Sequence, residues 1–161
     1  IDQQAEAAAL KEALAEGKNV TKEPAYAQKA ASHDGNDYGN TYAEVNLTAQ
    51  HMYFYKDGKK ILESDFVSGN VAKGHATPGG AFMLTYKTLN AVLRGPDYET
   101  PVTYWMPFNG GQGLHDADSW RSSYGGSIYR GNGSHGCVNC PYSTAATLYK
   151  YVDAGFPVIV Y

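Results

Sequence analysis

The stretch S-H-G-C-V-N-C-P, residues 134–141, decides how the rest of this sequence is interpreted. It places His135 two positions before Cys137, and a second cysteine, Cys140, three positions after it. Such a group fits a nucleophile with its base, half of a metal site, a redox-active pair, or two small buried residues beside a turn. Each of these alternatives belongs to a different class of protein.

A nucleophilic cysteine needs a partner that removes its proton. An unperturbed thiol has a pKa near 8.5, so only about 3 percent of it is thiolate at pH 7. The candidate bases are His135 and His115. On a strand, His135 would point alongside Cys137, whereas His115 comes from another segment and can approach the sulfur head on. We therefore expect His115 to be the base, and we expect a nearby histidine to hold part of Cys137 as thiolate.

The residues next to Cys137 suit acyl transfer. Gly136 lacks a Cβ, so a substrate carbonyl can approach the backbone N–H groups near Cys137, and these groups would form an oxyanion hole. Ser134 and Asn139 supply a hydroxyl and an amide that can fix the loop or hold a peptide.

The residues that precede this stretch predict a β-rich domain from Thr41 onward. Apolar side chains alternate with polar ones, at Ala43, Val45 and Leu47 and again at Met52 and Phe54. The pair Asp57-Gly58 then predicts a hairpin turn. A further strand is expected over residues 65–69, and the run T-P-G-G-A-F at 77–82 predicts a turn.

The last third of the chain predicts a long functional loop, a helix and a strand. Residues 109–136 are rich in glycine and still carry aromatic side chains, which is typical of functional loops. Helical spacing then runs from Ala145 to Val152, with Ser143 as the expected N-cap and Gly155 as the expected stop. A final strand is expected over 158–161. Strands do not alternate with helices, so the pattern disfavours a doubly wound parallel sheet.

The first forty residues differ from the rest of the chain in composition and hydrophobic pattern. Residues 5–17 predict a terminal helix that ends at a glycine, with only a thin apolar face. Residues 19–40 contain proline and polar turn formers, which are typical of a linker. We expect residues 1–40 to be the tail of a preceding module plus a linker, and residues 41–161 to form the main domain.

Composition excludes two classes of partner. The chain has 13 basic and 16 acidic residues, so it lacks the basic surface that nucleic acid requires. Its aliphatic runs are far shorter than the roughly 20 residues that span a bilayer, so this segment is not expected to contact a membrane. An export signal or anchor is likewise not expected within it.

Several segments resemble one family, the L,D-transpeptidases, which are bacterial enzymes that remodel peptidoglycan. The run S-H-G-C-V-N, preceded by His115, resembles their active-site signature. Four other segments resemble the same family: T-P-G-G-A-F at 77–82, Y-W-M-P-F at 104–108, H-D-A-D-S-W at 115–120, and G-F-P-V-I-V-Y at 155–161. The resemblance covers residues 41–161.

The resemblance implies a mainly β fold, an antiparallel β-sandwich with one or two short helices. It implies that Cys137 is the nucleophile and His115 the general base. By the same resemblance His135 lies beside the nucleophile, and Ser134, Gly136 and Asn139 complete the motif. We expect the catalytic set to contain Ser134, His135, Gly136 and Asp116, and the substrate-binding set to contain Asn139, Tyr104 and Trp120, which lies five positions after His115. The group that orients His115 stays open, because Asp116 stands where some members have serine.

The resemblance also implies a reaction and a location. The expected reaction is 3→3 cross-linking of peptidoglycan peptide stems through a thioester, with cleavage of the bond between the third, L-configured residue and D-Ala. Carbapenems are the expected covalent inhibitors, and neither a cofactor nor a metal is implied. The expected location is outside the cytoplasmic membrane, at the cell wall.

A zinc site is the alternative from another class. Cys137 and Cys140, together with His115 and His135, would complete four ligands in a wall-binding module that does no chemistry. A thioredoxin-like redox pair is disfavoured, because it needs a βαβ setting that the pattern lacks.

Overall fold

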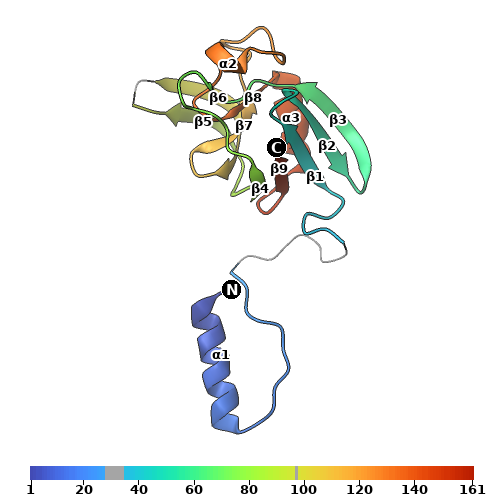
Figure 1. The fold of residues 1–161 in the computed structure, drawn as a ribbon, viewed down its shortest axis with the longest axis vertical. Helices are drawn as coiled ribbons and strands as arrows, with labels where there is room; N and C mark the ends of the chain where they lie inside the picture. Colours follow the sequence, from blue (N-terminus) through green and yellow to red (C-terminus); the bar gives the residue numbers. More distant parts are fainter. Residues whose placement is uncertain (28–34, 97) are drawn as a thin grey trace. The chain divides into compact units, whose positions relative to one another are not determined.

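The structure, a computed structural model, describes residues 1–27, 35–96 and 98–161. It contains two units, residues 1–37 and residues 38–161 (Figure 1). The predicted linker, residues 19–40, includes residues 28–34, which lie outside the described residues.

The first unit contains α1 (Gln3–Glu16), which confirms the predicted terminal helix. The carboxylate of Asp2 accepts hydrogen bonds from N–H groups of the first turn, and Gly17 ends the helix in the left-handed conformation at φ 65°. The segment after the helix returns to its first turn, where the N–H of Ala25 donates to Glu6 Oε2 over 2.8 Å. None of the side chains of α1 is buried, as the thin apolar face predicts.

The second unit is a sandwich of two sheets with short helices (Figure 1). One sheet has the order β3-β2-β1-β9-β4 and the other β5-β6-β7-β8. The strands are β1 (Tyr42–Asn46), β2 (His51–Lys56), β3 (Lys59–Asp65), β4 (Gly80–Met83), β5 (Thr88–Arg94), β6 (Glu99–Asn109), β7 (Gln112–Asp116), β8 (Val138–Cys140) and β9 (Pro157–Val160). Neighbouring strands are antiparallel except for the parallel pairs β1/β9 and β7/β8. The expected mainly antiparallel sandwich is confirmed.

The predicted hairpin joins β2 to β3. Asp57 and Gly58 have φ values of 51° and 74°, the conformation that a two-residue hairpin turn of the Asp-Gly type requires. The alternation in β1 and β2 also has its predicted effect, because every second side chain is buried.

The core lies between the two sheets and α3 (Tyr142–Tyr151), a helix that packs on β6, β7 and β3. Its buried apolar side chains come from both sheets and the helix, and they include Val45, Phe54, Met106, Leu114, Val138, Leu148 and Val158. Because β8 contributes to this core from directly after Cys137, packing fixes the strand that carries the nucleophile motif.

Two of the predicted segments differ in the structure. Residues 65–69 do not form a strand, because β3 ends at Asp65 and the chain then makes isolated bridges to Asn139 and Ser134. Residues 109–136 are not all loop, because β7 lies among them, and a short helix, α2 (Tyr129–Asn132), follows. Glycines on both sides of Gln112 hide the strand in the sequence, whereas pairing with β6 and β8 creates it.

The predicted ends of the last helix were also wrong. Pro141 holds the N-cap position of α3, and Ser143 lies inside the first turn. The carboxylate of Asp118 accepts a hydrogen bond from the N–H of Tyr142, so a distant loop caps this helix. The helix ends at Tyr151, before the expected stop at Gly155, and Val152 is its C-cap.

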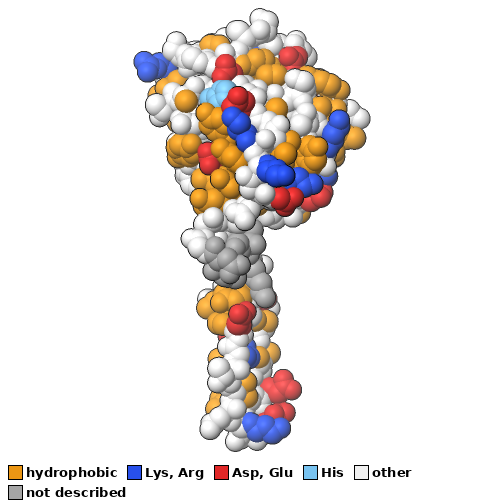
Figure 2. Space-filling model, turned by 90° about the vertical axis from the view of Figure 1, so that its right-hand side faces the viewer, with side chains coloured by type: hydrophobic (Ala, Val, Ile, Leu, Met, Phe, Trp, Pro, Cys, Tyr) orange, Lys and Arg blue, Asp and Glu red, His pale blue; other side chains and the backbone are white. Residues whose placement is uncertain are grey.

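Charged side chains of both signs lie on the surface of the second unit. On the face drawn in Figure 2, the Lys and Arg side chains at its lower right lie next to Asp and Glu. Among residues 1–27, 35–96 and 98–161, no helix is long and apolar enough to cross a membrane.

Candidate active site

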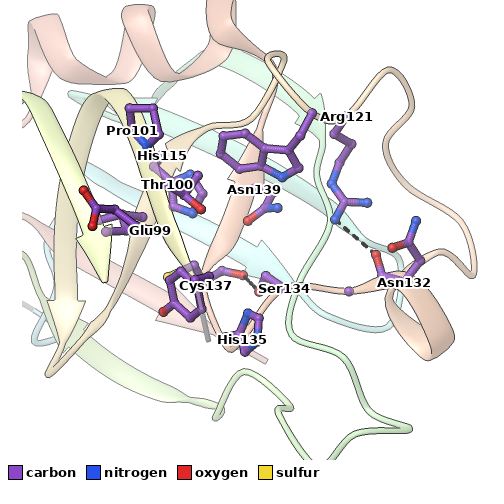
Figure 3. Close-up of a pocket in the computed structure, with 14 residues that line it drawn as sticks. Glu99, Thr100, Pro101, His115, Arg121, Asn132, Ser134, His135, Cys137 and Asn139 are labelled. Atoms are coloured by element: carbon purple, nitrogen blue, oxygen red, sulfur yellow. Dashed lines mark hydrogen bonds between the residues drawn. The ribbon is translucent and has the colours of Figure 1, made fainter. Parts of the chain in front are cut away.

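A pocket of about 330 Å³ opens beside the end of β7 and the start of β8. It is lined by six of the predicted site residues: His115, Trp120, Ser134, His135, Cys137 and Asn139. Figure 3 shows Glu99 and Thr100 on one side of Cys137, and Arg121 and Asn132 on the other.

The parallel pairing of β7 with β8 brings the predicted base next to the nucleophile motif. His115 is in register with Asn139, and β8 begins directly after Cys137. Residues 66–70 border the motif on its other side, where Val67 and Asn139 exchange two backbone hydrogen bonds of 2.9 Å. The motif is therefore held between two segments that are distant from it in sequence.

His115 is oriented by a main-chain group. It is only 3 percent exposed, and its Nδ1 lies 2.8 Å from the carbonyl oxygen of Asp116. A carbonyl can only accept, so Nδ1 carries the proton and Nε2 keeps a lone pair. Burial lowers the pKa of His115, although Asp116 opposes this effect. The ring is therefore neutral near pH 7 and can accept a proton at Nε2.

The side chain of Asp116 points to the other face of β7. Its carboxylate accepts hydrogen bonds from the N–H groups of Tyr104, at 2.7 Å, and Thr103, at 3.2 Å. These groups lie on β6, beyond the end of its ladder with β7. The carboxylate thus accepts the hydrogen bonds that a backbone carbonyl of a neighbouring strand would otherwise accept. Asp116 contacts His115 through its main-chain carbonyl oxygen.

Cys137 is a buried thiol in the resting structure. It is 8 percent exposed, and its Sγ lies 3.7 Å from the carbonyl oxygen of Gly111. Burial raises the pKa of Cys137 to about 11, although the backbone N–H of Gly113 lowers it. Within the described residues, no hydrogen bond joins Cys137 to His115. We expected a partial thiolate, whereas desolvation makes the thiol the resting form.

The loop before Cys137 presents a free backbone donor. The hydroxyl of Ser134 donates to the Cys137 carbonyl over 2.6 Å and accepts from the Gly136 N–H over 3.0 Å. Gly136 has a φ of 119°, which favours glycine, and its carbonyl accepts a 2.8 Å hydrogen bond from buried Thr77. In a trans peptide the next N–H points the opposite way, and no hydrogen bond in the described part of the chain uses the Cys137 N–H. This arrangement suits an oxyanion hole.

Comparison with known proteins agrees with this geometry. Residues 40–160 match the family model YkuD, described as the L,D-transpeptidase catalytic domain. The chain belongs to the L,D-transpeptidase family. A search of curated proteins gave no match.

Solved structures give the same result for this L,D-transpeptidase domain. A cysteine-to-serine mutant of an Enterococcus faecium L,D-transpeptidase is 41% identical, with a TM-score of 0.81, over 100% of this chain and 65% of that one. The E. faecium catalytic domain acylated by ertapenem is 46% identical, with a TM-score of 0.67, over 76% and 97%. An L,D-transpeptidase from Stackebrandtia nassauensis is 30% identical, with a TM-score of 0.63, over 83% and 58%. The present chain thus spans 65% of the length of that first E. faecium chain.

The two cysteines of this L,D-transpeptidase domain point in different directions. Cys137 lines the pocket, whereas Cys140 has no exposed surface and lies 3.9 Å from the sulfur of Met52 in the core. Cys137 directly precedes β8 and Cys140 ends it, and because side chains alternate along extended chain, the two face opposite sides. Among the described residues, no three His, Cys, Asp or Glu side chains gather as metal ligands. The zinc alternative therefore lacks a ligand set there.

The other predicted residues take different places around the pocket. The exposed ring of His135 stacks on the ring of Tyr98, with the two centroids 4.5 Å apart. The ring centroid of Trp120 lies 5.9 Å from that of His115. Tyr104 does not line the pocket, because it faces away from it on β6 and contacts Tyr142 and Tyr149. We do not retain Tyr104 as a substrate-binding residue.

Sequence reasoning missed two residues with clear places in the site. Thr77 also accepts a 3.0 Å hydrogen bond from the N–H of Gly69, so it joins two segments beneath the nucleophile loop. The run T-P-G-G-A-F contained it, but only as a turn signal. Arg121 lines the pocket directly after Trp120, and its proximity to the motif H-D-A-D-S-W was the available signal.

Proposed function

We propose that this chain catalyses 3→3 cross-linking of peptidoglycan peptide stems through a thioester on Cys137. The observation that carries the proposal is a single pocket, in a domain of this family, that contains the Cys137 thiol, a neutral His115 and the free N–H of Cys137. A nucleophile, a base and an oxyanion donor are the three groups that acyl transfer needs.

In the acylation step, His115 Nε2 takes the thiol proton as the sulfur attacks the carbonyl of the third residue of the donor stem. Negative charge develops on the carbonyl oxygen, where the Cys137 N–H stabilises it. The carbon–nitrogen bond then breaks, and His115 returns the proton to the amine of the departing D-Ala. Because the raised pKa of Cys137 keeps the thiol protonated, proton removal is coupled to attack.

In the second step, the side-chain amine of a neighbouring stem attacks the thioester. His115 takes the amine proton and passes it to the sulfur as the carbon–sulfur bond breaks, which gives the new amide and the free thiol. Water in place of the amine would give carboxypeptidase activity by the same route.

The remaining pocket residues position the loop and the substrate. The Ser134 hydroxyl donates to the Cys137 carbonyl and accepts from the Gly136 N–H, and Thr77 donates to the Gly136 carbonyl, so the loop around the nucleophile is fixed. Asn139 is 2 percent exposed, and its Oδ1 has no donor among the described residues, so it is suited to hydrogen-bond a peptide. Trp120 and His135 supply ring surface for the stem.

We propose carbapenems as covalent inhibitors of this chain, because the E. faecium catalytic domain has been solved acylated by ertapenem. The adduct is expected once per chain, on Cys137. Since peptidoglycan stems lie outside the cytoplasmic membrane, we also propose that the domain works there, at the cell wall.

Incubation with a disaccharide-tetrapeptide tests the proposal. Mass spectrometry is expected to show a dimer formed with loss of one D-Ala per cross-link, and a transient acyl adduct on the peptide that contains Cys137. Cys137→Ser is expected to abolish both, while Cys140→Ser, the matched control in the core, keeps most activity. Failure of the wild-type chain to form either the adduct or any product would overturn the proposal.

A further inference from the structure

Arg121 is a half-buried cation in the wall of the pocket. It follows Trp120, whose ring contacts His115, and one of its terminal nitrogens donates to the Asn132 carbonyl over 3.1 Å. This hydrogen bond holds the guanidinium in place. The Nε atom is buried and has no acceptor within the described residues.

The charge of Arg121 has no carboxylate partner among residues 1–27, 35–96 and 98–161, where the ion pairs involve other cations. Of the described residues that line the pocket, Arg121 alone is a lysine or arginine. The positive charge of Arg121 also acts on the base, because its electrostatic repulsion helps to lower the pKa of His115. A partly desolvated cation of this kind is well placed for an anionic ligand.

The opposite wall of the pocket contains a carboxylate that is already paired with a cation. Glu99 lines it there and forms an ion pair with Arg94 over 3.1 Å. Figure 3 shows Glu99 and Arg121 on opposite sides of Cys137. Because Arg94 neutralises Glu99, Arg121 carries the unpaired charge among the described residues that line the pocket, and a carboxylate in the pocket is attracted to its side.

We propose that Arg121 binds the free carboxylate of the residue that leaves in acylation, and that it thereby selects donor peptides in which one terminal residue follows the scissile bond. This inference rests on the proposed function. Three covalent bonds separate the scissile carbonyl carbon from that carboxylate carbon, a span of about 4 Å. A donor that acylates Cys137 must therefore place its carboxylate within the same pocket, where a guanidinium offers two parallel donors.

The test compares a disaccharide-tetrapeptide with the same molecule capped as its C-terminal carboxamide. The kcat/KM for release of the terminal residue is measured by chromatography and mass spectrometry. The wild-type chain is expected to prefer the free acid by about 10- to 100-fold, the usual worth of a charge-assisted hydrogen bond. Arg121→Gln is expected to lose this preference by slowing only the free acid, and Arg121→Lys to keep an intermediate preference.

Arg130→Gln is the matched control, because Arg130 lies on α2 outside the pocket and the net charge changes equally. It is expected to retain the full preference. Equal use of the two peptides by the wild-type chain would overturn the inference while leaving the proposed function intact. This comparison uses the wild-type chain alone, so it does not depend on whether a variant folds. A full preference in Arg121→Gln would also overturn it. Absence of turnover on both peptides by the wild-type chain would instead count against the proposed function.

Discussion

At the scale of single residues, the reactive pair is prepared by burial and by one main-chain hydrogen bond. The carbonyl of Asp116 fixes the tautomer of His115, and desolvation keeps both the imidazole and the Cys137 thiol neutral. Neutral partners suit a mechanism in which the proton moves as the sulfur attacks, with His115 as the base.

His115→Gln tests the base. Loss of the proton acceptor is expected to reduce the acylation rate of Cys137 by about 10²- to 10⁴-fold, the usual contribution of a general base. The rate of adduct formation with a carbapenem is measured by mass spectrometry, and thermal unfolding is the control for folding. Near-normal acylation by a folded variant would move the base elsewhere, with exposed His135 as the next candidate.

The pH dependence of alkylation tests the resting state of the nucleophile. Iodoacetamide reacts with the thiolate, and the pKa of Cys137 is raised to about 11 by burial. Below that pKa the thiolate fraction rises about tenfold per pH unit, so the alkylation rate at Cys137 is expected to climb from pH 7 to about pH 10. Peptide mass mapping gives the rate. A rate that is already maximal near pH 7 would indicate a preformed thiolate–imidazolium pair.

At the scale of elements, the nucleophile loop depends on segments that are remote in sequence. Thr77, at the turn before β4, accepts from the Gly69 N–H and donates to the Gly136 carbonyl. The same peptide group carries the Cys137 N–H on its other side. The turn therefore sets the direction of the oxyanion donor without touching the substrate.

Thr77→Val tests this positioning role. The change keeps the shape but leaves the Gly136 carbonyl and the Gly69 N–H without their partner, which costs about 1–3 kcal/mol of stability. Acylation by a β-lactam or a peptide needs the oxyanion donor, so its rate is expected to fall by about tenfold or more. Alkylation of Cys137 by iodoacetamide does not need it and is expected to stay unchanged.

Thr77→Ser is the matched control, because it restores the hydroxyl and is expected to restore most of the acylation rate. Equal slowing of acylation and alkylation in Thr77→Val would indicate general disorder of the site and would contradict the positioning role.

At the scale of the whole molecule, residues 38–161 contain both sheets, their common core and the pocket. The first strand of this unit, β1, pairs in parallel with the last, β9. This pairing joins the two ends of the unit through hydrogen bonds between its own strands.

Removal of residues 1–37 is expected to leave a folded and active domain. The midpoint of thermal unfolding of residues 38–161 should lie within a few degrees of that of the second unit in the whole chain, because no core residue is lost. The kcat/KM on a disaccharide-tetrapeptide should match that of the longer chain. A loss of more than about tenfold in kcat/KM would show that the first unit contributes to the site.

Local patterns in the sequence were sufficient for several features. The alternation in β1 and β2, the Asp-Gly turn and the helix that ends at Gly17 follow from short-range preferences of the backbone. The choice of Cys137 and His115 as the candidate pair followed from residue chemistry and from the signature around them. These features depend on residues that are close in the chain, so their order alone carries the information.

Other features depended on which distant segments meet. Strand β7 formed among glycines because β6 and β8 supply its hydrogen-bond partners, and Asp118 replaced Ser143 as the cap of α3. The orienting carbonyl of Asp116, the support from Thr77 and the unpaired charge of Arg121 likewise appear only once the chain is folded. Tertiary structure decided them because hydrogen-bond geometry and desolvation depend on distances in space, which residue order does not contain.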